Sequence, residues 1–189
     1  MFNYELKIPK ERIAVLIGSK GETKKKIEEE TKTKLEIDSK EGDVILSGED
    51  AILLYTARNI VRAIGRGFNP ELALLLLKQD YSFELISLNF ENPNQLKRIR
   101  GRVIGKDGKT RQIIEEMTES YVSVYGKTIS IIGTIESVIN AKRAIEMLIK
   151  GSPHSNVYKW LEKRRREQKK REYEEFYIKR DNIRDNIDI

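Results

Sequence analysis

The chain contains an internal repeat, and this repeat limits its possible folds more than any other feature of its 189 residues. Residues 12–38 align without gaps to residues 99–125, and the aligned positions share glycines, threonines, isoleucines and paired glutamates. Further along, the alignment resumes with two residues fewer in the second copy, as expected when a loop changes length and the core keeps its register. A chain of this length that carries one pattern twice predicts two small domains with the same fold.

The first copy predicts the order strand, helix, helix, strand, strand, helix. Apolar and polar residues alternate over residues 2–8, which is the period of a half-buried strand. The later segments follow helix or strand periodicity and are separated by glycine, proline or charged turn residues. We expect helices at 10–17 and 22–31, strands at 35–37 and 44–46, and a third helix that opens at 48–50 and runs to 64.

The second copy predicts the same elements with one polar insertion, residues 89–94, after its first strand. We expect strands at 81–88, 121–125 and 127–132, and helices around 95–100, 109–118 and 135–149. The predicted fold class is therefore α+β, with a three-stranded antiparallel sheet and three helices in each domain.

The remaining segments divide the chain. Residues 71–78 predict one helix with leucines on most faces, which we expect to be buried between the domains. After the second copy, Val157, Trp160 and Leu161 form one apolar face of a terminal helix. We expect a first domain at residues 1–66, a linker helix at 67–79, a second domain at 80–152 and a basic helical tail at 153–189.

The composition argues against several classes of site. The chain has no cysteine and a single histidine, so a thiolate or imidazole metal centre and a cofactor are not expected. The histidine, His154, follows a proline and is interpreted as a turn residue before the tail helix. The longest apolar run, residues 72–77, is too short for a membrane span, and the first residues read as a strand and not as a signal peptide. We expect a cytoplasmic protein that contacts no membrane and catalyses no reaction.

The net charge of +6 lies in the second half of the chain. Residues 1–80 carry 14 basic and 14 acidic groups, so the whole excess falls in residues 81–189. A basic excess of this kind suggests a polyanionic partner, because released counterions add to the affinity for nucleic acid.

Each copy carries a Gly-x-x-Gly loop between its first two helices, at residues 18–21 and 105–108. Because glycine has no Cβ, a sugar-phosphate backbone can approach the main chain closely there. The loop leads into a helix whose unpaired N–H groups and dipole favour a phosphate. Phosphate contacts hold a strand, while the bases are read in the neighbouring groove. The expected aliphatic platforms for bases are Ile17, Leu35 and Ile37 in the first copy and Ile104, Val122 and Val124 in the second.

The candidate RNA-binding residues surround these loops. The lysine run 24–26 is more typical of a solvated helix face, whereas the basic cluster that leads into the second loop is the stronger candidate. Asp107 places a carboxylate beside the expected phosphate path, and neighbouring cations would offset it. The full set is Ile17, Gly18, Ser19, Lys20, Gly21 and Lys24 in the first copy, and Arg98, Arg100, Arg102, Ile104, Gly105, Lys106, Asp107, Gly108, Lys109 and Arg111 in the second.

The surroundings of both loops resemble the type I KH domain, in which a short helix and isoleucine precede the glycines and a charged helix and a strand follow. Two segments of the second copy, GRVIGKDGKT at 101–110 and GSPHSNVY at 151–158, resemble the Partner-of-Nob family of small-subunit ribosome assembly factors in its archaeal form. The resemblance spans residues 1 to about 160. It implies type I KH domains that bind single-stranded RNA near the 3′ end of small-subunit rRNA. It also implies partnership with the rRNA-maturation endonuclease and with other assembly or initiation factors.

The sequence leaves several alternatives open. In eukaryotic members of that family the first domain has lost its glycine loop, whereas Gly18 and Gly21 are present here, so one or both grooves could hold RNA. The chain could instead be a protein-interaction scaffold with vestigial loops, or an RNA-binding subunit of an RNA-degrading complex. The tail is equally consistent with a solvated helix and with an arm that contacts RNA or a partner through Tyr173, Phe176 and Tyr177.

Overall fold

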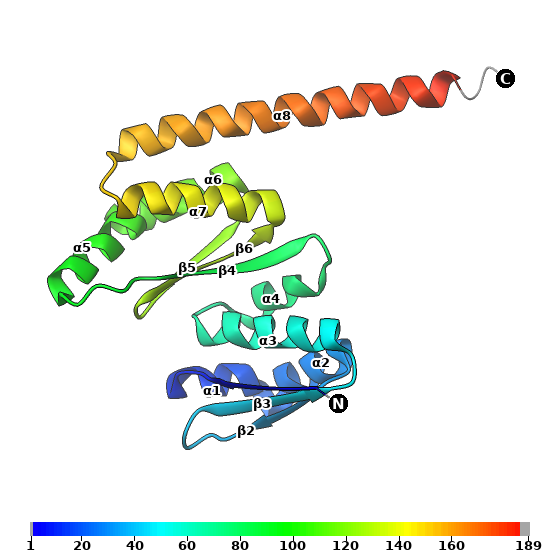
Figure 1. Cartoon of the computed structure of the whole chain (residues 1–189), viewed down its shortest axis with the longest axis vertical. Coiled ribbons are helices and arrows are strands. Elements are labelled where there is room, and N and C mark those ends of the chain that lie inside the picture. Colours follow the sequence, from blue (N-terminus) through cyan, green and yellow to red (C-terminus); the bar gives the residue numbers. More distant parts are fainter. Residues whose placement is uncertain (1, 186–189) are drawn as a thin grey trace.

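The computed structural model describes the backbone of residues 2–185 and the side chains of residues 2–178. Two similar α+β units are stacked on each other, and a long C-terminal helix lies across the second unit (Figure 1). The predicted fold class is confirmed: each unit contains a three-stranded antiparallel sheet and three helices in the predicted order.

The first unit follows the predicted element order closely. Asp50 caps the third helix, because its carboxylate accepts hydrogen bonds from the N–H groups of Ile52 and Leu53 at 2.8 and 3.0 Å. The strands pair in the order β1-β3-β2, all antiparallel. The elements are β1 (Phe2–Lys7), α1 (Lys10–Ile17), α2 (Glu22–Thr31), β2 (Lys34–Ile37), β3 (Asp43–Gly48) and α3 (Ala51–Gly65).

The second unit repeats this topology with the strand order β4-β6-β5. Its first helix begins earlier than the predicted 95–100, because Asn92 accepts a hydrogen bond from Asn94 N–H and Pro93 occupies the first helical turn. The helix also ends later than predicted, at Ile104. The elements are β4 (Tyr81–Ser87), α5 (Pro93–Ile104), α6 (Lys109–Thr118), β5 (Tyr121–Tyr125), β6 (Thr128–Thr134) and α7 (Ile135–Ile149).

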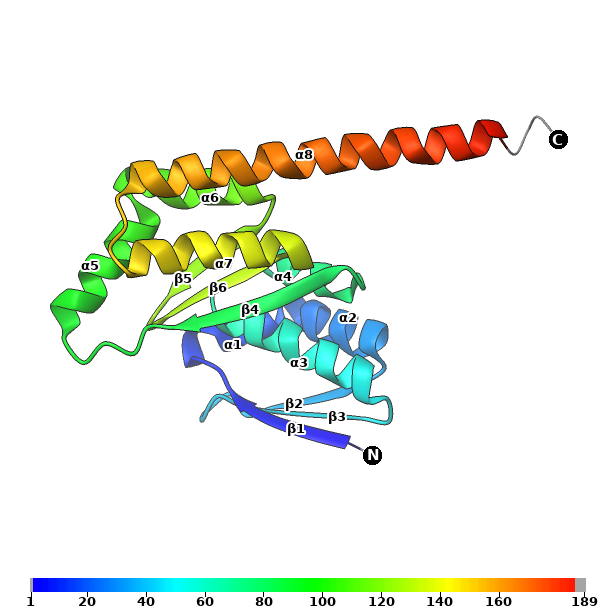
Figure 2. The same cartoon turned by 45° about the horizontal axis from the view of Figure 1, so that its top comes forward.

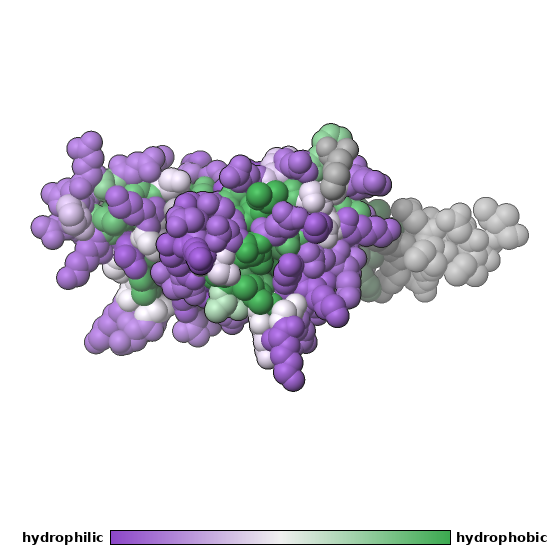
Figure 3. All heavy atoms as spheres, turned by 90° about the horizontal axis from the view of Figure 1, so that it is seen from below, coloured by the Kyte–Doolittle hydropathy of each residue, from purple (hydrophilic) through white to green (hydrophobic). Residues whose placement is uncertain are grey.

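The two sheets differ in what covers their outer faces. In the first unit, Ile45 in the middle of β3 points away from the helices and is 43% exposed. From below, that side of the molecule shows hydrophobic side chains in the middle of a hydrophilic surface (Figure 3). In the second unit, β6 is buried along almost its whole length, and Ile132 belongs to the hydrophobic core of the first unit. The first unit therefore packs on the sheet of the second.

Contacts between the units are both apolar and polar. The guanidinium of Arg62 on α3 lies 5.6 Å from the ring centre of Phe83 on β4. Ser123 Oγ on β5 donates to the carbonyl of Arg66 at 2.8 Å. The Tyr125 hydroxyl donates to the carboxylate of Glu11 on α1.

The apolar segment between the units is two short helices, not the single helix expected at 71–78. They are α4 (Pro70–Ala73) and the 3-10 helix η2 (Leu74–Leu77). Ala73 and Leu76 are buried in the core of the first unit, and η2 contacts α3 as well as β4 and β6. This segment therefore contributes to the contact between the two units.

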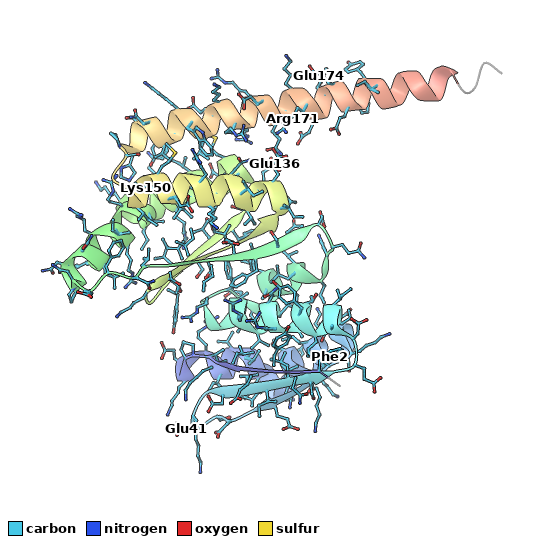
Figure 4. The ribbon with its side chains drawn as sticks, in the orientation of Figure 1. Phe2, Glu41, Glu136, Lys150, Arg171 and Glu174 are labelled. Atoms are coloured by element: carbon cyan, nitrogen blue, oxygen red, sulfur yellow. The ribbon has the colours of Figure 1, made fainter. Side chains whose placement is uncertain are left out.

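The predicted C-terminal helix is present as α8 (His154–Asp185). Val157 and Leu161 are buried against α6 and α7, and the helix then extends past the body of the molecule (Figure 2). An ion pair between Arg171 and Glu136 joins α8 to the first turn of α7 (Figure 4). Within residues 2–185, no helix is both long and apolar enough to cross a bilayer.

Candidate nucleic-acid interface

The first glycine of each loop is required by the local backbone. Gly18 has φ 75° and ψ 176°, and Gly105 has φ 75° and ψ 178°, a conformation that only glycine adopts readily. A Cβ at Gly18 would also lie 2.3 Å from Thr23 Oγ1, and one at Gly105 would lie 2.2 Å from Thr110 Oγ1. These glycines therefore set the shape of the loop.

The second glycine of each loop leaves main chain open to solvent. A Cβ at Gly21 or Gly108 would meet no atom within 4 Å. Both residues are helix N-caps, and neither offers a side chain to accept hydrogen bonds from the first turn of α2 or α6. The first N–H of each helix, that of Glu22 or Lys109, donates to the carbonyl of Ser19 or Lys106. No side chain caps the rest of the first turn, and the bare glycine lets a phosphate approach it.

The two middle residues of each loop project outward. Ser19, Lys20, Lys106 and Asp107 are exposed, and the residue next to the open glycine is Lys20 in the first loop and Asp107 in the second. Asp107 is in the left-handed region with φ 52°, which aspartate tolerates. Its side chain does not cap α6.

Two of the predicted cations already have an acidic neighbour. Lys24 Nζ lies 4.0 Å from Glu28, and Arg111 Nε lies 3.7 Å from Glu115, at matching positions of the repeat. Each glutamate also accepts the N–H of the second residue of the next strand, Leu35 or Val122, at 2.7 Å. Burial raises the pKa of the Glu115 carboxyl, while the Val122 N–H and Arg111 act in the opposite direction. Lys24 and Arg111 therefore balance these carboxylates.

The three arginines of the basic cluster on α5 have different surroundings in the structure. Arg98 is exposed, whereas Arg102 donates to the carbonyls of Leu148 and Ser152 at 3.1 and 2.6 Å. Arg102 thus holds the C-terminal end of α7. Arg100 is half-buried, and within residues 2–178 its Nε has no hydrogen-bond partner.

The same capping of the third helix occurs in the first unit from a different position. Arg12 donates to the carbonyls of Ile64 and Phe68 at 2.8 and 2.6 Å. In the repeat alignment, Arg12 corresponds to Ile99, which lies about one helical turn before Arg102. The two units therefore make the same contact from different positions of the repeat.

The predicted base platforms are corrected in part. Leu35 and Val122 are 1% and 4% exposed and belong to the cores of the two units, so no base can lie on them. Both residues lie on the predicted alternating strands, β2 and β5, but their side chains face the helices. The half-buried platform residues that remain are Ile17 and Ile37 in the first unit and Ile104 and Val124 in the second.

Sequence reasoning missed two aromatic residues at the second loop. His154 and Tyr158, at the start of α8, line a hollow together with Arg98, Lys106 and Lys109. The sequence predicts His154 only as a turn residue before the helix. The side chains meet because α8 folds back on α6, a tertiary contact that periodicity does not reveal. Among residues 2–178, no group of acidic, histidine or cysteine side chains is arranged to hold a metal.

Comparison with known domain families agrees with this architecture. Residues 3–64 match the KH domain profile, and residues 82–166 match the profile for the second KH domain of PNO1, described as a eukaryotic type (type I) KH domain. The second match extends into α8 and therefore includes His154 and Tyr158.

Individual proteins similar to this chain narrow the comparison further. It is 49% identical over 175 residues to a KH domain-containing protein of Methanocaldococcus jannaschii, covering 89% of this chain and 77% of that protein. It is 35% identical over 119 residues to the pre-rRNA-processing protein pno1 of Aspergillus fumigatus, covering 60% of this chain and 47% of that longer protein.

A solved structure shows the same fold with RNA. The Dim2p chain in the crystal structure of an a/eIF2alpha–aDim2p–rRNA complex from Pyrococcus horikoshii superimposes with a TM-score of 0.81 and 52% sequence identity. The match covers 88% of this chain and 95% of that chain. The identity and coverage of these relatives confirm the resemblance seen in the sequence, and the chain belongs to the archaeal branch of the PNO1/Dim2 family of KH-domain proteins.

Proposed function

We propose that this protein binds single-stranded RNA and holds the 3′ region of small-subunit rRNA while a separate endonuclease matures that end. The observation that carries the proposal is the pair of helices, α2 and α6, whose uncapped first turns open behind a bare glycine. A phosphate can reach main-chain N–H groups there, and half-buried aliphatic side chains lie alongside for unstacked bases.

The relatives support the choice of RNA. The Pyrococcus Dim2p was crystallised with rRNA and a/eIF2alpha, and the Aspergillus relative is named as a pre-rRNA-processing protein. We propose that this chain takes the same class of RNA and that a translation initiation factor and the maturation endonuclease are its protein partners. The role is to position RNA, it takes place in the cytoplasm, and it requires no bond-breaking chemistry from the chain itself.

The test is binding of short RNAs followed by fluorescence anisotropy. The purified chain should bind a single-stranded oligonucleotide with the 3′ sequence of small-subunit rRNA and should bind the same sequence far more weakly in a duplex. Adding acidic charge to the second loop, with Lys106→Asp and Gly108→Asp together, should weaken binding at least tenfold. Unchanged affinity in that variant would favour a protein-interaction scaffold with vestigial loops.

Cross-linking in cells tests the identity of the RNA. Mapped cross-links should cluster near the 3′ end of small-subunit rRNA. Cross-links spread over messenger RNA with none at that end would contradict the assembly role and leave a general KH-domain RNA binder.

A further inference from the structure

A basic hollow lies behind the second glycine loop, between α5, α6 and the first turns of α8. It has a volume of about 570 Å3. Arg98, Lys106 and Lys109 line it and are exposed. Within residues 2–178, none of these three cations forms an ion pair with a carboxylate, so their charge is available to an anionic ligand.

One wall of the hollow is aromatic and held in place. Tyr158 Oη lies 3.0 Å from Thr110 Oγ1, and His154 Nε2 donates to the carbonyl of Arg102 at 2.9 Å. The two rings lie 6.1 Å apart between centres at a 58° tilt. Because both side chains are already fixed by the protein, a base or ribose that packs on them loses little affinity to ordering of the site.

The floor of the hollow includes a glycine that the protein itself does not require. Gly101 lies within α5 with ordinary helical φ, and a Cβ there would meet no atom within 4 Å. Glycine inside a helix costs roughly 0.5–1 kcal/mol relative to alanine. The matching residue of the first repeat is Ala14. A bare stretch of helix backbone beside three cations is explained by close approach of a ligand.

The first unit provides an internal comparison. The chain that leaves the first unit turns at Gly67, which has φ 98°. The chain that leaves the second unit and enters α8 turns in the same way at Gly151, which has φ 97°. The corresponding hollow, of about 430 Å3, is lined by α2, α4 and the first residue of η2. Where the second hollow has Lys109, His154 and Tyr158, the first has Glu22, Pro70 and Leu74. The two hollows occupy the same place in the fold, and of the two the second alone combines cations with aromatic rings.

We propose that this second hollow binds the nucleotide that flanks the segment held in the groove of the second KH domain. Its phosphate contacts Lys106 and Lys109, and its base or ribose packs on Tyr158 and His154. The hollow shares Gly105 and Lys106 with the glycine loop and Lys109 with the helix that follows, so a strand that crosses the loop reaches the hollow without a break. This inference rests on the proposed function, because it extends the same RNA path by one nucleotide.

The test is a length series of single-stranded RNAs, extended one nucleotide at a time, combined with 4-thiouridine placed at each position. In the wild-type chain, one added nucleotide should strengthen binding roughly fivefold to tenfold, as base stacking on aromatic side chains does. Photo-cross-links from that nucleotide should map to His154 or Tyr158. The Tyr158→Leu variant, which copies the first unit, should lose this gain.

Two matched variants control for folding and for access. Tyr158→Phe keeps the ring and removes only the hydroxyl, so it should keep most of the gain. Gly101→Gln fills the open floor with a good helix former and should abolish the gain, whereas Ala14→Gln in the first unit should not. If one added nucleotide strengthens binding equally in Tyr158→Leu and wild type, with cross-links confined to the groove, the proposal that the hollow binds RNA is overturned and the proposed function stays intact. Failure of every RNA to bind would overturn both.

Discussion

The first and second KH domains carry the same glycine loop in different surroundings. The first glycines share φ 75°, and the second glycines have φ 79° and 77°. Around this common backbone, the first loop is followed by Glu22 and the second by Lys109, and of the two hollows beside the loops the second alone is lined by aromatic rings. The outer face of the first sheet is open, and that of the second is covered by the first unit. The two domains therefore share the turn and differ in the charge and exposed surface around it.

The largest expected difference concerns the two sheets. Ile132 is fully buried between the units, so Ile132→Ala should lower the free energy of unfolding by about 2–5 kcal/mol. Ile45 is 43% exposed on the open sheet, and Ile45→Ala should lower it by less than about 1 kcal/mol. Urea unfolding followed by circular dichroism measures both. Similar losses would mean that the outer face of the first sheet is also covered in solution, for example by a second copy.

The next comparison concerns the arginines that hold the end of the third helix, and here we expect the two units to behave alike. Arg102→Gln and Arg12→Gln each remove two hydrogen bonds from a guanidinium to carbonyls at or beyond the end of the third helix. Each should lower the free energy of unfolding by roughly 2 kcal/mol, since hydrogen bonds to charged groups contribute about 1.5–3 kcal/mol. Urea unfolding of both variants measures the loss. An unchanged free energy of unfolding in either variant would show that these two hydrogen bonds do not stabilise that unit.

The third difference is in RNA affinity. Lys106→Glu should weaken binding about tenfold, and Lys20→Glu by about threefold, because the second loop stands in the more basic surroundings. The slope of log affinity against log salt should become shallower by about 0.7 for each phosphate that the variant no longer neutralises. Anisotropy titrations between roughly 50 and 200 mM salt give both quantities. Equal weakening in the two variants would show that both loops hold RNA to the same extent.

The sequence predicted what local spacing controls. The aligned glycines locate both loops, and the alternation and helical periods place strands and helices in the right order. The N-terminal extension of α5 is also readable, because Asn92 followed by Pro93 is a helix-start signal, but the polar composition there favours an insertion. Contacts distant in sequence are not accessible. Alternation does not say that Leu35 and Val122 face the core, and nothing in α5 alone indicates that Arg102 reaches carbonyls 46 and 50 residues away.

The smallest expected difference is a pH effect at Glu115 in the second domain. Burial raises the pKa of the Glu115 carboxyl in the folded chain, so the folded state binds a proton more tightly than the unfolded state does. The stabilisation linked to this proton is fully present below the unfolded pKa of about 4.3 and is lost as the pH rises through the higher folded pKa.

The glutamine side chain of the Glu115→Gln variant cannot titrate, and its amide oxygen can still accept the Val122 N–H. The stability of the variant relative to wild type should therefore improve by a few tenths of a kcal/mol as the pH rises through this window, allowing for partial solvent screening of the side chain. Urea unfolding at several pH values measures the difference. A relative stability that falls with rising pH would mean that Arg111 and the Val122 N–H outweigh burial, and that the carboxylate stabilises the second domain by its charge.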